Sequence, residues 1–303
     1  MKIYFAGSYT RRELDILADY HCPIMQNWST VDRNDPLWKK LKTGEIDDVI
    51  FDSGGFQVQT GTRGMRGIGT GSVIDRSAYA DRYSGKKWAP AGNPVKWILS
   101  TSIDTYALWL ELTLQDYPNI KYMCLDVPRN NAKTLDNLAY LESCGLSPIP
   151  IWHATGSEVY DTILDYYCDR YEYIAIGGIA LGNRRHTFNL FSYLMQKYPH
   201  MKFHLLGIGL GLSNICRIYR PYSADASSWL APARWGSELI FDGKNIKLRG
   251  MSPEDRLAIR KNDDVRTEWS LKTIQRLKEF EKVMNNTLPT EPVQANLFTG
   301  EEN

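Results

Sequence analysis

The sequence has 303 residues, of which 43% are hydrophobic and 23% are charged, with 36 Lys and Arg against 35 Asp and Glu. These proportions are those of an ordinary globular protein, and they argue against a disordered, collagen-like or membrane-spanning chain. A formal net charge of +1 also argues against binding nucleic acid by bulk charge alone. We therefore expect any polyanion to bind at a local basic patch.

Eight short apolar runs, separated by longer helical or loop stretches, predict a parallel sheet with crossover helices. The runs are Ile3–Ala6, Ile24–Trp28, Val49–Asp52, Tyr122–Asp126, Pro148–His153, Tyr173–Gly177, Phe203–Gly207 and Tyr222–Trp229. Several end in polar or glycine residues, as in an α/β fold of the (β/α)8 TIM-barrel type, where the carboxyl ends of the strands build the active site. We expect this barrel to span residues 1–250. An open doubly wound sheet is the alternative.

Two segments depart from the repeat. Residues 60–100, after the third strand, are a long insertion rich in glycine, basic and aromatic residues, and long loops in that position are usually functional. Ser252 and Pro253 are typical of a helix start. We expect a C-terminal helical extension over 251–288, broken near 262–264, and a disordered tail over 289–303.

The cysteines favour neither disulfide bonds nor a metal site. All five are at least 20 residues apart and none forms a Cys-x-x-Cys pair, which indicates reduced thiols and no metal.

No run approaches the roughly 18 apolar residues of a membrane helix, and the first residues contain no signal-peptide core. We therefore expect a cytoplasmic protein without a membrane partner.

The segment after the third strand reads Asp52-Ser53-Gly54-Gly55-Phe56-Gln57. Two glycines let the backbone approach a flat ligand, and the ring of Phe56 can stack on it; a tight turn with a helix N-cap is the alternative. The six residues resemble the signature of the tRNA-guanine transglycosylases, (β/α)8 enzymes that exchange guanine in a nucleic acid for a 7-deazaguanine base. The resemblance implies that Asp52 is catalytic and that Ser53, Gly54, Gly55, Phe56 and Gln57 bind the substrate.

The ends of the next strands extend this resemblance. Asp126 matches the family's base-reading Asp, whose carboxylate accepts from N1–H and the amino group of guanine; capping a turn is the alternative. His153 stands where the family has a base-contacting Gln. Gly177-Gly178-Ile179 resembles the family segment whose backbone lines the base pocket. Gly207-Ile208-Gly209 resembles the Gly-Val-Gly at the end of the family's seventh strand. The Gly-x-Gly-x-Gly motif at 207–211 does not predict a dinucleotide-binding site, because its third glycine is not at the spacing which that motif requires.

The eighth strand contains Asp225, which matches the family's covalent nucleophile, although its neighbours differ from the family pattern. Base exchange that keeps the anomeric configuration requires two displacements. The resemblance implies that Asp225 forms the glycosyl ester. Asp52 would protonate the leaving guanine and then take a proton from the incoming base. A surface or capping role is the alternative for Asp225.

The zinc subdomain of the tRNA enzymes has no counterpart here, because no cysteine follows Cys216. In this respect the chain resembles the deoxypurine-in-DNA protein A family, which puts 7-deazaguanines into bacterial or phage DNA. The resemblance implies a DNA-guanine transglycosylase that uses a free 7-deazaguanine base and no cofactor. A tRNA-guanine transglycosylase without zinc and a non-catalytic nucleic-acid- or base-binding subunit are the alternatives.

Two further expectations concern the nucleic acid and a protein partner. We expect nucleic acid to contact basic and glycine residues of the strand-end face, unless these are ordinary solvated loop residues. They are Arg63, Arg66, Lys86, Lys87, Arg184, Arg185, Gly207, Gly209, Arg217, Arg220 and Arg234. In the tail, Gln294, Leu297 and Phe298 resemble peptides that bind the replication sliding clamp; the alternative is that Leu297 and Phe298 fold back onto the barrel.

Overall fold

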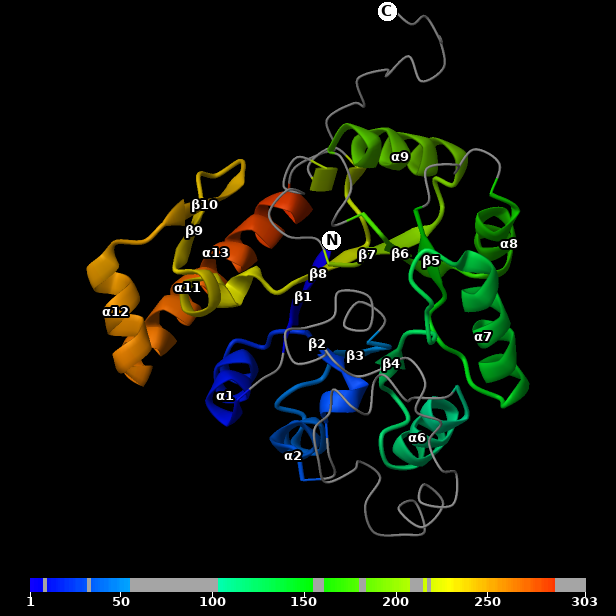
Figure 1. The fold of residues 1–303 in the computed structure, drawn as a ribbon, viewed down its shortest axis with the longest axis horizontal. Helices are drawn as coiled ribbons and strands as arrows, with labels where there is room; N and C mark the ends of the chain where they lie inside the picture. Colours follow the sequence, from blue (N-terminus) through cyan, green and yellow to red (C-terminus); the bar gives the residue numbers. More distant parts are fainter. Residues whose placement is uncertain are drawn as a thin grey trace, which may run out of the picture. The chain divides into compact units, whose positions relative to one another are not determined.

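The computed structural model describes residues 1–7, 10–31, 34–54, 103–154, 161–179, 184–207, 215–216 and 219–286. The fold is α/β: eight parallel strands alternate with helices, an arrangement compatible with the expected (β/α)8 barrel (Figure 1). The chain divides into two compact units. The N-terminal unit is Ala6–His153, and the C-terminal unit is Met1–Phe5 with the chain from Ala154 onward.

Four of the described parallel strands belong to the N-terminal unit. They are β2 (Ile24–Asn27), β3 (Val49–Asp52), β4 (Lys121–Tyr122) and β5 (Ile151–His153). Strand β3 pairs with β2 on one side and with β4 on the other. Past β4 the pairing continues as a single bridge between Met123 and Ile149. Consequently Asn27 lies opposite Asp52 at the carboxyl ends of β2 and β3.

The described helices of this unit are α1 (Arg11–Asp19), α2 (Pro36–Thr43), α6 (Ile103–Asp116) and α7 (Asn131–Ser143), with the 3-10 turn η1 (Trp28–Thr30). Three of them, α1, α2 and α7, begin at a residue whose side chain caps them. Helix α1 starts with a capping box in which Thr10 and Glu13 each bind the other's backbone N–H. Helix α2 is capped at its start by Asp35, whose side chain accepts from Leu37 N, and at its end by Gly44, which is left-handed at φ +74°.

Aromatic rings fill the space between this sheet and its helices. Trp28, Phe51 and Trp109 are all 2% exposed or less. The Trp109 ring contacts Phe51 edge-on at 5.1 Å between centroids and lies 5.5 Å from Trp28. Each such ring pair stabilises the fold by about 0.5–1.5 kcal/mol beyond the contribution of apolar burial. This packing fixes the end of β3, from which the Asp52–Gly54 segment leaves the sheet.

The C-terminal unit contains its own set of parallel strands, in the order β1-β8-β7-β6. Their bounds are β1 (Lys2–Ala6), β6 (Tyr173–Gly177), β7 (Lys202–Leu205) and β8 (Ser223–Ala226), and the accompanying helices are α8 (Thr162–Arg170) and α9 (Arg184–Lys197). Strand β8 is central and all four of its residues are buried. A carboxylate on β8 therefore lies inside the protein and needs polar partners.

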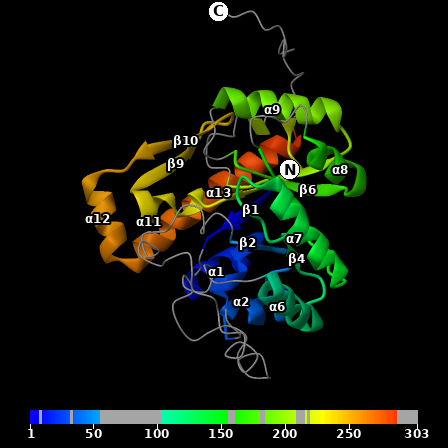
Figure 2. The same cartoon turned by 45° about the vertical axis from the view of Figure 1, so that its right-hand side comes forward.

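The chain after β8 forms several short helices and strands, followed by a helix of 24 residues. They are η4 (Ser228–Leu230), α11 (Ala231–Trp235), β9 (Ser237–Phe241), β10 (Ile246–Gly250), α12 (Pro253–Lys261) and α13 (Asp263–Asn286). Strands β9 and β10 form an antiparallel hairpin. Helices α11 and α13 pack against β9, and α12 packs against α11 and α13; Figures 1 and 2 show this group from two directions. The helix start at Pro253 and the break near 262–264 are confirmed.

All eight expected strands are present, but five are shorter than predicted. Strand β2 ends at Asn27, one residue early, and β7 ends at Leu205. Strand β5 begins only at Ile151, because Pro148 and Pro150 have no N–H for a sheet bond. The other two are β4 and β8. The run Tyr122–Asp126 leaves the sheet after Met123, because the next residues bond to α7 instead: Leu125 O accepts from Asn137 Nδ2 and Val127 N donates to Thr134 Oγ1. The run Tyr222–Trp229 ends as a strand at Ala226, and Trp229 is buried within a 3-10 turn instead. The β9–β10 hairpin was not predicted. None of the described helices combines the length and apolar character that crossing a membrane requires.

Candidate active site

The turn after β3 brings the Asp52–Gly54 segment against β2. Gly54 has φ +83°, and a Cβ atom there would come within 2.9 Å of Asn27 Nδ2. A side chain at this position would therefore meet both backbone strain and a collision. The indole Nε1 of Trp28 donates to the backbone oxygen of Ser53 at 3.0 Å. These contacts fix the turn so that the Ser53 side chain points inward, and Ser53 is 3% exposed.

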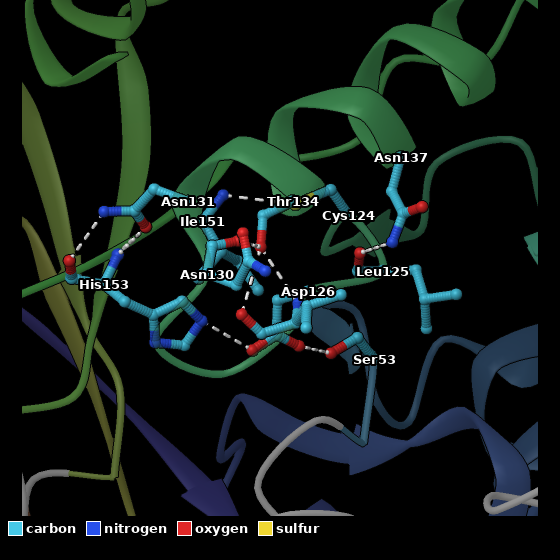
Figure 3. Close-up of polar contacts among 11 residues, drawn as sticks. Ser53, Cys124, Leu125, Asp126, Asn130, Asn131, Thr134, Asn137, Ile151 and His153 are labelled. Atoms are coloured by element: carbon cyan, nitrogen blue, oxygen red, sulfur yellow. Dashed lines mark hydrogen bonds and ion pairs between the residues drawn. The ribbon is translucent and has the colours of Figure 1, made fainter. Parts of the chain in front are cut away.

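Ser53 meets Asp126, the residue expected to read the base (Figure 3). The Ser53 hydroxyl donates to Asp126 Oδ1, and His153 Nε2 lies 2.9 Å from Asp126 Oδ2. An ionised carboxylate only accepts, so His153 Nε2 is the donor. Each carboxylate oxygen keeps one further lone pair for a ligand. The cluster joins side chains from the ends of three parallel strands, as the sequence predicted.

Asp126 is not a turn cap in the described part of the chain. Helix α7 is capped by Asn130, whose side chain accepts from Lys133 N. The backbone N–H of Val127, next to Asp126, donates to Thr134 Oγ1 at 2.9 Å. The turn is therefore held by Asn130 and Thr134, and both Asp126 oxygens remain directed at Ser53 and His153.

His153 is held at its main chain by Asn131, a residue that the sequence analysis missed. His153 N donates to Asn131 Oδ1 at 2.8 Å, and Asn131 Nδ2 donates to His153 O at 2.9 Å (Figure 3). Asn131 begins α7, one residue after its N-cap. The Asn130-Asn131 pair is the only sign in the sequence, and it reads as an ordinary helix start. The two bonds set the direction of the His153 ring toward Asp126.

Two buried, uncharged side chains, Tyr106 and Cys124, accompany the cluster of Ser53, Asp126 and His153. Burial raises the pKa of the Tyr106 hydroxyl well above its usual value, and the hydroxyl donates to Met123 O at 2.7 Å. Burial, with a smaller contribution from Asp126, also raises the pKa of Cys124, whose thiol accepts from Ile151 N. Both groups stay uncharged at neutral pH. The surroundings are therefore of low polarity, which strengthens hydrogen bonds to the Asp126 carboxylate.

The C-terminal unit contains Asp225, the expected nucleophile, on β8. Its side chain is 10% exposed, and Oδ1 accepts from Gly207 N at 2.7 Å. Gly207 follows β7 with φ +65°, a conformation that glycine adopts readily and other residues rarely do. His204 Nε2 lies 3.6 Å from the same oxygen. Within the described residues, both contacts reach Oδ1, so Oδ2 is the oxygen with no such contact.

His204 belongs to a buried polar network. It lies opposite Ser223 in the β7–β8 pairing, and its Nδ1 is 2.8 Å from Ser223 Oγ. The Tyr173 hydroxyl is 2.8 Å from Ser223 Oγ and 3.2 Å from His204 Nδ1. Either hydroxyl can donate to Nδ1, and that tautomer carries its proton on Nε2, which faces Asp225. The sequence analysis missed His204; its only signal is one polar residue inside an apolar run.

Searches against models of protein families, against curated proteins and against solved structures return no match. The site must therefore be interpreted from its own chemistry. Within the described ranges, no group of three or more His, Cys, Asp and Glu side chains is arranged to hold a metal ion. His200 and His204 are four residues apart, but His204 lies in a strand, so this spacing does not form the helical zinc motif.

The remaining expected site residues fall into three groups. Gly177 is the last residue of β6, and Gly178 and Ile179 follow it; Gly178 is left-handed at φ +77°. Arg184 and Arg185 begin α9, Arg220 has φ +40°, and Arg234 is exposed on α11. The others lie outside the described residues: Gly55, Phe56, Gln57, Arg63, Arg66, Lys86, Lys87, Gly209, Arg217, Gln294, Leu297 and Phe298.

Proposed function

We propose that the protein is a DNA-guanine transglycosylase, which removes guanine from DNA and inserts a 7-deazaguanine base through a glycosyl-aspartate intermediate. The observation that carries the proposal is the bond between Ser53 and Asp126. Ser53 belongs to the signature-like segment after β3, and Asp126 is the base-reading candidate after β4. Base recognition that uses both residues requires Ser53 and Asp126 to lie side by side. They are hydrogen-bonded to each other within the N-terminal unit.

Asp126 would read the edge of the base. Ser53 and His153 each occupy one position on the carboxylate, which leaves one lone pair on each oxygen for the N1–H and the exocyclic amino group of guanine. Adenine presents no such pair of donors on that edge. Charge-assisted bonds of this kind are about twice as strong as neutral ones, so a buried, pre-oriented carboxylate would select guanine and 7-deazaguanines.

Asp225 would attack the sugar. Its Oδ2 forms a bond to C1′ while the bond from C1′ to N9 of guanine breaks, and the electron pair of that bond goes to the base. Asp52 gives the leaving guanine a proton. The incoming 7-deazaguanine then loses its N9 proton to Asp52 and displaces Asp225 from C1′. Gly207 N and His204 on Oδ1 would hold the carboxylate in one orientation during both steps.

We further propose that the α/β fold is a complete (β/α)8 barrel with an insertion after β3, followed by the helical extension. DNA is favoured over tRNA because these 303 residues contain no cysteine after Cys216, whereas the zinc subdomain that helps the tRNA enzymes hold their substrate is built on cysteines. The balanced reaction consumes one base and releases another. It needs neither ATP nor a redox cofactor.

Isotope exchange tests this proposal directly. The protein is incubated with labelled guanine or a labelled 7-deazaguanine base and with either DNA or tRNA, and label in the polymer is counted. We expect uptake into DNA, loss of uptake in Asp225→Asn, and normal uptake in Asp169→Asn, which changes an exposed carboxylate of α8. Uptake into tRNA alone would establish the tRNA alternative. No uptake into either polymer would leave a non-catalytic binding subunit.

A further inference from the structure

A small hollow in the C-terminal unit is lined by three arginines and a tryptophan. It measures about 120 Å³ and lies between α11 and α12. Its charged lining is Arg234, Arg256 and Arg260, and its ring is Trp235. Only Arg234 was expected to contact nucleic acid from the sequence. Arg256 and Arg260 are one helical turn apart, so α12 presents both guanidinium groups on one face.

These arginines have no carboxylate partner among the described residues. The nearby Glu238 is bound by Arg249 at 2.6 Å and by Arg276 at 2.8 Å, and Asp263 is bound by Arg266. Asp255, on α12 itself, accepts from Ser252. Three cations that share a hollow repel one another, and an anion that binds there relieves this repulsion. The arrangement therefore favours a ligand with negative charge.

The backbone is shaped to hold one of the arginines in place. Gly236 ends α11 at φ +58°, and a Cβ atom there would come within 2.8 Å of Arg256 Cδ. The missing side chain lets Arg256 lie across the turn, where its Nε donates to Met251 O at 3.1 Å. This bond leaves the outer nitrogens of Arg256 available. A guanidinium fixed in this way loses less entropy when it binds a phosphate.

Trp235 specifies the kind of anion. Trp235 is 52% exposed, although a large aromatic residue is normally well buried. Exposed aromatic rings beside arginines are typical of sites that bind single-stranded nucleic acid, where bases stack on the ring and cations follow the phosphates. A free phosphate would make no use of the indole. An acidic protein segment would use the charges but would gain less from a flat, open ring.

We propose that this hollow, Arg234-Trp235-Arg256-Arg260, binds an unpaired segment of the DNA strand, with phosphates at the arginines and one base on Trp235. The inference rests on the proposed function for the choice of DNA. A transglycosylase must take its target base out of the duplex. Unpaired nucleotides therefore exist next to the reacting one, and a site that holds them would stabilise the opened strand.

Binding of a fluorescent single-stranded oligonucleotide, measured by anisotropy at several salt concentrations, tests the inference. We compare wild type with Arg234→Glu/Arg260→Glu and with Trp235→Ala. The matched control is Lys244→Glu/Lys282→Glu, which reverses two exposed cations of the same unit. The arginine double variant should bind at least tenfold more weakly. Its salt slope should fall by about 1.4, since each phosphate contact to a single strand contributes about 0.7.

Trp235→Ala should weaken binding several-fold without changing the salt slope, because it removes stacking and leaves the charges. Unchanged affinity in the arginine double variant, or an equal loss in the lysine control, would overturn the inference. So would an acidic peptide that competes equally with the oligonucleotide. Wild-type exchange activity with unchanged binding in the arginine variant would refute this site alone. Arginine-dependent DNA binding without exchange would refute the transglycosylase and keep the site.

Discussion

Replacing His153 with alanine isolates the side-chain bond to Asp126. The main chain of His153 is held by Asn131 through two hydrogen bonds of 2.8 and 2.9 Å, which alanine keeps. The ring donates to Asp126 at 2.9 Å, and the two side chains are 7% and 6% exposed. The variant therefore removes one buried, charge-assisted hydrogen bond and leaves the backbone arrangement in place.

The expected loss follows from this geometry. A hydrogen bond to a charged group contributes about 1.5–3 kcal/mol, and Ser53 remains as the other partner of the Asp126 carboxylate. His153→Ala should therefore lower the free energy of unfolding by about 1.5–3 kcal/mol. If Asp126 reads the base, its affinity for guanine should also fall roughly tenfold, because the carboxylate is no longer held in one orientation.

Urea denaturation followed by tryptophan fluorescence measures the first effect, and titration calorimetry with guanine measures the second. His153→Gln restores an amide donor and should recover at least half of the lost stability. His200→Ala removes an exposed histidine and should change neither quantity. A loss below about 0.5 kcal/mol in His153→Ala, the range of an ordinary surface substitution, would refute the reasoning. Equal damage from His153→Gln would refute it as well.

Three further predictions can be checked with the same preparations. Asp225→Asn still accepts from Gly207 N, so the variant should fold but lose exchange on the order of a thousandfold or more; label uptake above a tenth of wild type would remove Asp225 from the nucleophile role. Gly54→Ala meets Asn27 Nδ2 at 2.9 Å with φ +83°, and thermal unfolding should show a destabilisation of about 1–3 kcal/mol; an unchanged melting temperature would contradict this. For Glu238, burial raises the pKa, but bonds to its two arginine partners outweigh burial and hold the pKa below its usual value. A lowered folded pKa means that this stability is present above the unfolded pKa and is lost as the pH falls through the folded one. Glu238→Gln should therefore flatten the loss of stability between about pH 5 and pH 3, and a wild-type profile in the variant would show that the group contributes nothing.

Local sequence determined the elements whose signals are contained in a few neighbouring residues. Val49–Asp52 and Tyr173–Gly177 were predicted with their observed bounds, because each is a short apolar run that ends in polar or glycine residues. Pro253 after Ser252 determined the start of α12. The β9–β10 hairpin also has a local signal, Asp242-Gly243 between two strand-like runs. The sequence analysis does not predict the hairpin, because it assigns residues up to 250 to the barrel repeat.

Tertiary structure decided the partners of the candidate site residues. Ser53 and Asp126 are 73 positions apart, and only the pairing of β3 with β4 brings their chain segments together. Asn131 reads as part of a helix start, and His204 reads as one polar residue in a strand. Their roles depend on which main chain or carboxylate faces them. Residue type sets which hydrogen bonds a side chain can make, whereas the packing of distant strands sets which of those bonds are formed. For that reason the sequence could nominate Asp126 and Asp225 but not the groups that hold them.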